Sequence, residues 1–235
     1  MQKAQLHFAS PQVVVSGKPA LTQLSGDAWL KQSSPSVWTL WLAHSEFRLN
    51  DKKQQLSDIG VRISRKQQGN RWQLYAKQAN VERWLGLIEP FSLLPKNVDD
   101  IVQALQPSGE LLKLNVVLDT QEDQPVLYTI AAEAHDVSVA SWDGIPAGDH
   151  LYGVVAANNN GGRFQLTTPE IQDARYELKL HFPGVYLEPL VARQAHGQVD
   201  WFLSDQQLRI VGDGLKLSTE LVDNIQGGFQ VWVPF

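Results

Sequence analysis

The stretch Leu151-Tyr152-Gly153-Val154-Val155 reads apolar, any residue, glycine, any residue, apolar at the head of a predicted strand. The same pattern occurs at residues 24–28, 195–199 and 225–229. Two copies also share their spacing, because apolar segments follow Gly153 and Gly197 at the same intervals of 11 and then 7 residues. These segments begin at Phe164 and Ile171 in one copy and at Leu208 and Leu215 in the other. A repeat of 44 residues is typical of architectures in which each unit contacts its neighbours and function comes from an extended surface.

Alternation of apolar and polar residues dominates the chain and predicts strands with one apolar face. Clear cases are residues 38–42, 60–63, 71–75, 164–166, 176–182, 208–210 and 215–217. Residues that tolerate turn conformations separate these segments; they include Asn50-Asp51, Gly69-Asn70, Ser204-Asp205 and Asp213-Gly214. The sequence therefore predicts a mainly β fold, an elongated antiparallel sheet whose strands are joined mostly by short turns.

Two short amphipathic helices are predicted in the middle of the chain. Asn80 can cap a helix over Val81–Ile88, and Asn97 can cap a second over Val98–Leu105. The helices divide the chain into a first β segment (1–79), a helical insert (80–108) and a second β segment (109–235). Their apolar stripe is expected to face the concave side of the sheet; it comprises Trp84, Leu85, Ile88, Ile101 and Leu105.

Composition excludes several function classes. A net charge of −5 and a pI near 5.7 argue against a nucleic-acid partner, which would require clustered lysines and arginines. The absence of cysteine excludes disulfides, thiolate metal sites and cysteine nucleophiles. The motifs of hydrolases, nucleotide-binding loops and metal sites do not occur, so we expect no enzyme, no catalytic residue, no metal and no cofactor.

Two histidine–aspartate neighbours, His135-Asp136 and Asp149-His150, are the nearest approach to a catalytic group. Adjacent residues of a strand point to opposite faces, so neither pair is expected to converge on one site.

One continuous apolar face is predicted in the second β segment, because its apolar residues keep a period of two within each strand. The face comprises Phe164, Leu166, Leu178, Leu180, Val199, Trp201, Leu208, Ile210, Leu215, Leu217, Phe229 and Val231. A second sheet could cover it in a sandwich, or the sheet could stay single and curved with a ligand on its concave side. Alternation does not separate these two arrangements.

A family resemblance favours the second arrangement. Residues 81–85, 93–95, 105–111, 137–142 and 145–148, leading into 151–153, follow one another as in a known family. In this order the chain resembles the AsmA-like, YhdP and TamB superfamily of bacterial bridge-like lipid transfer proteins, and most closely its YhdP branch. Ala147 departs from the family pattern, in which glycine often follows the proline directly.

The resemblance implies a repeating β-groove whose apolar channel carries phospholipid acyl chains between the inner and outer membranes of Gram-negative bacteria. It also implies a periplasmic segment of a longer protein, with an inner-membrane anchor and an outer-membrane contact in other parts of that protein. Both ends of the chain are expected to be cut within a repetitive architecture.

Two other readings stay open from the residues alone. A structural or protein-binding β-repeat module, such as an adhesin-like scaffold, would cover its own core and expose a recognition surface. A glycan-processing or glycan-binding β protein would need a carboxylate pair about 5–10 Å apart in a cleft lined by aromatic residues. The eight tryptophans could form a carbohydrate-stacking platform, an interfacial membrane belt or ordinary core, and we expect most of them to lie in the core or line a groove.

Overall fold

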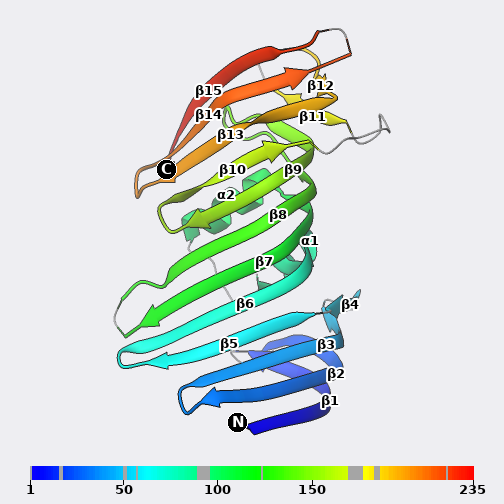
Figure 1. Ribbon diagram of the computed structural model, residues 1–235, viewed down its shortest axis with the longest axis vertical. Helices are drawn as coiled ribbons and strands as arrows, with labels where there is room; N and C mark the ends of the chain where they lie inside the picture. Colours follow the sequence, from blue (N-terminus) through cyan, green and yellow to red (C-terminus); the bar gives the residue numbers. More distant parts are fainter. Residues whose placement is uncertain are drawn as a thin grey trace. The chain divides into compact units, whose positions relative to one another are not determined.

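The computed structural model describes residues 2–15, 18–49, 52–56, 58–88, 96–122, 124–168, 177–182, 186–220 and 222–235, most of them in strands (Figure 1). The first strands are β1 (Gln2–Val15), β2 (Lys18–Ser34), β3 (Val37–Leu49), β4 (Lys52–Leu56), β5 (Ile59–Lys66) and β6 (Gly69–Asn80). After the helices come β7 (Ser108–Gln121), β8 (Leu127–Val139), β9 (Ala147–Asn158), β10 (Gly161–Thr167), β11 (Leu178–His181), β12 (Leu190–Ala192), β13 (Gln194–Leu203), β14 (Gln207–Ser218) and β15 (Ile225–Pro234). The prediction of a mainly β, antiparallel fold with two short central helices is confirmed.

The helices are α1 (Val81–Ile88) and α2 (Lys96–Leu105), so the second begins one residue before its predicted cap. The last turn of α2 ends because Gln106 adopts a left-handed backbone with φ of 44° and Pro107 follows it. The carbonyl of Leu105 accepts a hydrogen bond from the backbone N–H of Ala140 at 2.7 Å. The carboxyl end of α2 is thereby fixed to the chain just beyond β8.

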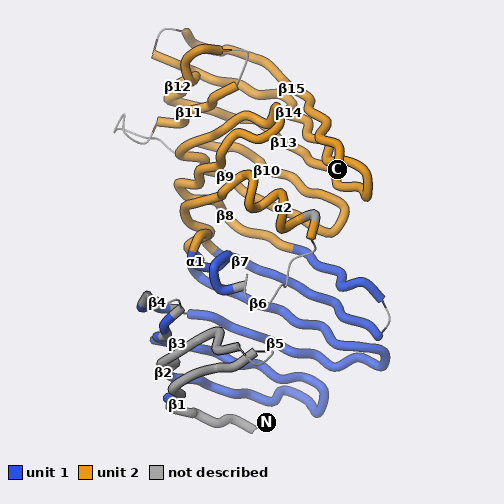
Figure 2. The backbone as a smooth tube through the Cα atoms, turned by 180° about the vertical axis from the view of Figure 1, so that it is seen from behind, with its two compact units in different colours: residues 1–79, 83–93, 113–129 blue, residues 80–82, 94–112, 130–235 orange. Residues whose placement is uncertain are grey.

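The strands form one sheet in the order β1-β2-β3-β5-β6-β7-β8-β9-β10-β13-β14-β15, with β4 beside β3 and with β11 and β12 branching from β9. The chain divides into two compact units, which are described separately (Figure 2). Unit 1 comprises residues 1–79, 83–93 and 113–129. Unit 2 comprises residues 80–82, 94–112 and 130–235.

In unit 2, β10 and β11 lie end to end in the sheet, and both pair with β9. β10 pairs with the second half of β9 and with β13, whereas β11 pairs with the first residues of β9 and with β12. The predicted strand at residues 176–182 corresponds to the shorter β11.

Several long strands carry one residue with a left-handed backbone in their interior. These residues are His44 in β3, Lys113 in β7, Asp136 in β8, His150 in β9 and Gly214 in β14. In β3 and β14 the pairing register shifts at this point, because three residues of the strand there span two of its partner. Such bulges bend a strand and increase its local twist. The sheet within each unit is therefore curved by a built-in extra residue (Figure 1).

The repeat predicted from Gly153 and Gly197 is not kept as a pairing register. Phe164 lies opposite Val155, whereas Leu208 lies opposite Leu203, so the two hairpins turn at different distances from their glycines. The prediction of separate strands at Leu208 and Leu215 is wrong, since β14 contains both, and Ile171 lies outside the described residues. Asp213-Gly214, predicted as a turn, is the bulge of β14, because positive φ serves a bulge as well as a turn.

Candidate functional site

Four neighbouring strands of unit 1, β2, β3, β5 and β6, present apolar side chains in three transverse rows. Residues directly opposite each other on antiparallel strands lie on the same face of the sheet. The rows are Trp38, Ile63 and Trp72; Leu30, Leu40, Val61 and Leu74; and Ala28, Leu42, Ile59 and Ala76. We call these eleven side chains the unit 1 apolar face.

The unit 1 apolar face is covered at one end and open at the other. Ala28, Ile59 and Ala76 are buried, and Leu40 and Val61 in the middle row are half-buried. Trp38 and Trp72 in the outer row are 36% and 39% exposed. An apolar ligand could therefore contact the middle and outer rows without displacing buried side chains.

Sequence reasoning missed this face as a site, although it identified the alternating stretches 38–42, 60–63 and 71–75. The signal that could have found it is the coincidence of an apolar residue at every second position in three successive segments. The prediction used only the second β segment.

The twelve residues predicted to line a groove all lie in unit 2, in two packed clusters that share Phe229. The first cluster contains Phe164, Leu166, Leu178, Leu180, Leu215, Leu217 and Phe229. The second contains Val199, Trp201, Leu208, Ile210, Phe229 and Val231. We call them together the unit 2 apolar face.

The chain itself closes much of the unit 2 apolar face. Leu178 and Leu208 are only 0% and 3% exposed. Helix α2 lies across one face of the strands of unit 2, where Ile101 and Leu105 pack against the second cluster (Figure 2). Trp142 and Ile145, which bracket a tight turn, pack there as well. The unit 2 apolar face is therefore mostly buried as part of the protein core.

The predicted helix stripe is only partly accounted for. Ile101 and Leu105 contact the sheet of unit 2, as described above. In α1, Trp84 and Leu85 are half-buried. The side chain of Ile88 lies outside what the structure describes.

Glycines let aromatic rings lie across neighbouring strands of the unit 2 apolar face. A Cβ atom at Gly212 would stand 2.3 Å from the ring of Phe229, and one at Gly162 would stand 2.3 Å from the indole of Trp201. Both distances are far inside van der Waals contact. The two rings therefore occupy the space that a side chain on the paired strand would otherwise fill.

The bulge in β14 keeps the apolar side chains of this strand on one face. Leu208 and Leu215 are separated by an odd number of positions, which in a regular strand would place them on opposite faces. The extra residue at Gly214 reverses the alternation. Both halves of β14 consequently contribute to the unit 2 apolar face.

The opposite face of unit 2 carries charged side chains together with exposed apolar ones such as Phe202 and Trp232. Arg163 Nε donates a hydrogen bond to Asp200 Oδ1 at 2.7 Å, and Gln198 Nε2 donates to Asp200 Oδ2 at 2.6 Å. The hydrogen bond from the Arg163 guanidinium lowers the pKa of Asp200 below its ordinary value. Charges thus mark the side of these strands that water covers.

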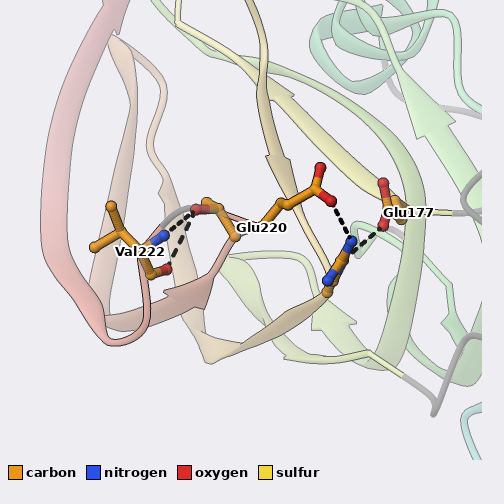
Figure 3. Close-up of polar contacts among 5 residues, drawn as sticks. Glu177, Glu220 and Val222 are labelled. Atoms are coloured by element: carbon orange, nitrogen blue, oxygen red, sulfur yellow. Dashed lines mark hydrogen bonds and ion pairs between the residues drawn. The ribbon is translucent and has the colours of Figure 1, made fainter.

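A second polar group fixes the junction between β12 and β13. Figure 3 shows the carboxylates of Glu177 and Glu220 directed toward one guanidinium, that of Arg193, at 3.4 and 2.9 Å. The backbone N–H of Arg193 also donates to the carbonyl of Ser218 at 2.8 Å. The arrangement is an exposed ion-pair network, and such networks contribute little to stability.

The two histidine–aspartate neighbours meet across strands in a way that the sequence prediction did not consider. His150 Nδ1 lies 2.6 Å from Asp136 Oδ1, so one member of each pair forms a joint contact. Both residues have left-handed backbones, which redirect their side chains from the regular alternation. The expectation that neither pair converges concerned each pair by itself and stays a prediction; it did not consider this contact between the two pairs.

Within the described residues, no three His, Cys, Asp or Glu side chains gather as metal ligands would. Likewise, none of the helices in the described part of the chain is long and apolar enough to cross a membrane.

Comparison with known proteins gives one match. The family model described as "YhdP protein" matches residues 1–234, nearly the whole chain. No curated protein and no solved structure matches the chain.

Proposed function

Because the chain belongs to the YhdP protein family, we propose that it is a segment of a lipid transport protein that carries phospholipid acyl chains along an apolar sheet face. The single observation that supports this most is the partly open unit 1 apolar face. A soluble domain that exposes two tryptophans beside two rows of aliphatic side chains needs a reason to leave them uncovered.

The energetics of such a face suit transport. Each methylene of an acyl chain that leaves water for an apolar surface gains about 0.8 kcal/mol. A few buried methylenes hold the chain on the face, and the middle and outer rows, which are both accessible, offer it adjacent positions. A lipid bound in this way is retained but can still slide.

The remaining parts of the proposal follow from the family resemblance. The segment would work in the periplasm of a Gram-negative bacterium, between inner and outer membranes, and the membrane anchor would belong to other parts of the parent protein. The transported molecule would be a phospholipid, and the segment would perform no chemical reaction on it.

One observation favours a second candidate function, a structural or protein-binding β-repeat module. The unit 2 apolar face is mostly buried by its own chain, as a core would be, with Leu178, Leu208 and Leu215 nearly inaccessible. In this reading the sheet is a scaffold, and the exposed tryptophans of unit 1 would contact another protein.

Site-specific photo-crosslinking separates the two candidates. A photoreactive amino acid replaces Leu40 or Val61 on the unit 1 apolar face, and after irradiation in living cells the purified chain is analysed by mass spectrometry. Covalent phospholipid adducts are the expected result. Thr39 and Arg62 are matched control positions, because they neighbour the test residues in the same strands but point to the opposite face.

The outcome decides between lipid and protein. Adducts of equal yield at test and control positions would mean non-specific labelling, and protein adducts confined to Leu40 and Val61 would support the scaffold reading. Either result would remove the lipid transport proposal.

A further inference from the structure

Three half-exposed aromatic side chains form a row on the other face of unit 1. Trp29 lies opposite Trp41, Trp41 lies opposite Gly60, and Gly60 lies opposite Tyr75, across β2, β3, β5 and β6. The aromatic residues are 39%, 43% and 39% exposed in that order. We call Trp29, Trp41 and Tyr75 the aromatic row; it does not include Trp38, which belongs to the unit 1 apolar face.

The indole of Trp41 lies low across the sheet because Gly60 leaves room for it. A Cβ atom at Gly60 would stand 2.9, 3.0 and 3.1 Å from three neighbouring carbons of the Trp41 ring. Tyr75 then meets Trp41 edge to face, with ring centroids 6.2 Å apart and planes at 69°. This packing holds the indole in place and leaves part of it exposed to solvent.

A row of hydrogen-bonding side chains runs beside the aromatic row on the same face. Its members, in strand order, are Lys31, Thr39, Arg62 and Gln73. Within the described part of the chain, Lys31 and Arg62 have no ion-pair partner, and this row contains no carboxylate. On the far side of the aromatic row, Asp27 is accompanied by His44 at 4.0 Å.

We propose that the aromatic row and the adjacent polar row together bind an acidic glycan, a chain of sugars that carry carboxylate or phosphate groups. The C–H face of a sugar ring is apolar and packs against an aromatic face, while its hydroxyls extend sideways to donors and acceptors. Lys31 and Arg62 supply positive charge for the acidic groups.

The geometry favours a glycan over a bilayer surface. An indole that lies low over a strand cannot insert into the lipid headgroup region, whereas it can stack on a flat ring. Trp29 and Tyr75 are three strand spacings apart, roughly 14 Å, so the row can contact more than one linked sugar. This site goes beyond the proposed lipid transport, which uses the opposite face of the same strands.

The test is isothermal titration calorimetry of the whole chain with two oligosaccharides of six sugars, an acidic hexagalacturonate and a neutral maltohexaose. We expect the acidic probe to bind at least tenfold more tightly. Trp41→Ala should weaken its binding about tenfold or more, and Arg62→Gln should remove the preference for the acidic probe. Trp38→Ala is the matched control, because it removes a similarly exposed indole from the other face of β3 and should leave affinity unchanged.

Gly60→Ala keeps every aromatic residue but pushes the Trp41 ring away, so it should also weaken binding. If circular dichroism shows that Trp41→Ala does not fold, Gly60→Ala and Arg62→Gln test the proposal in its place. Lipid adducts at Leu40 should persist in Trp41→Ala, Arg62→Gln and Gly60→Ala, which separates the glycan site from the transport proposal.

Three results would overturn the glycan site. They are no binding of the hexagalacturonate, an equal loss of affinity in Trp38→Ala, and Trp41-dependent flotation with vesicles of phosphatidylethanolamine and phosphatidylglycerol in the absence of glycan binding. The last would identify the row as a membrane contact.

Discussion

A negative charge should have opposite consequences at two apolar positions, Leu40 on the open unit 1 apolar face and Ile210 on the closed unit 2 apolar face. Leu40 is half-buried, so an aspartate there can keep its carboxylate in water. Ile210 is 8% exposed and packed in a cluster with Leu208 and Val233. We predict that Leu40→Asp stops lipid binding in a folded protein, whereas Ile210→Asp disrupts the fold itself.

The magnitudes follow from burial. Replacing Ile210 forfeits about 1.5–3 kcal/mol of apolar burial and leaves an unpaired charge, for a total above about 4 kcal/mol. That is a large part of the roughly 5–15 kcal/mol that stabilises an ordinary domain. Replacing the half-buried Leu40 costs only about 1 kcal/mol of protein stability. An acyl chain that covers the new carboxylate must dehydrate it, which costs about 3 kcal/mol or more and weakens lipid affinity over a hundredfold.

Two measurements on each variant test this prediction. Urea unfolding followed by circular dichroism gives the stability, and mass spectrometry of organic extracts gives the bound phospholipid per chain. Leu40→Ala controls for loss of the leucine and should retain lipid. Thr39→Asp controls for the added charge, because it places a carboxylate on the opposite face of the same strand.

The reasoning fails if folded Leu40→Asp carries as much phospholipid as the unaltered chain, since the unit 1 apolar face would then not be where lipid binds. It also fails if Ile210→Asp unfolds at the same urea concentration as the unaltered chain. In that case the unit 2 apolar face would be hydrated rather than closed.

Two further predictions concern stability. Gly212→Ala should lower the free energy of unfolding by about 1–3 kcal/mol, because its Cβ would overlap the ring of Phe229. Gly227→Ala is the control and should have a smaller effect, because nothing lies within 4 Å of a Cβ atom there. Equal urea midpoints for the two variants would contradict this prediction. Asp200→Asn should flatten the acid limb of the stability curve. The pKa of Asp200 is lowered in the folded protein, so its contribution is present above the unfolded pKa of about 3.9 and is lost as pH falls through the folded value. The effect should be below about 1 kcal/mol because the Arg163–Asp200 pair is near the surface, and an unchanged loss of stability from pH 5 to pH 2 in Asp200→Asn would refute it.

Much of the fold could be predicted from local sequence, since strand alternation and helix capping are local properties. Val81–Ile88 was predicted with the observed bounds, and α2 begins two residues before the predicted start at Val98. Which residues share a face within a strand is equally local, and every predicted groove residue of unit 2 belongs to one of its two apolar clusters. Whether lipid occupies that face is a different question, which the crosslinking and charge variants address.

Strand pairing could not be predicted in the same way. Alternation says nothing about where Leu208 finds its partner, so the apparent repeat of Gly153 and Gly197 did not correspond to a common register. The contact between Asp136 and His150 joins residues 14 apart in sequence through two left-handed residues, and neither conformation has a unique sequence signal. The open unit 1 apolar face was missed because exposure depends on what packs above a strand.

The bulges explain how a strongly curved strand can remain apolar on one side. Bending a long strand requires an extra residue, and an extra residue alone would turn every later side chain to the wrong face. In β14 the apolar residues occupy even positions before the bulge at Gly214 and odd positions after it. Ile210 and Leu215 therefore lie on the same face of the sheet, although the bulge separates them. The change from even to odd apolar positions and the left-handed residue at Gly214 therefore belong together, because each offsets the effect of the other on which face the side chains occupy. A face built in this way stays continuous around the bend, which a regular strand of the same composition would not allow.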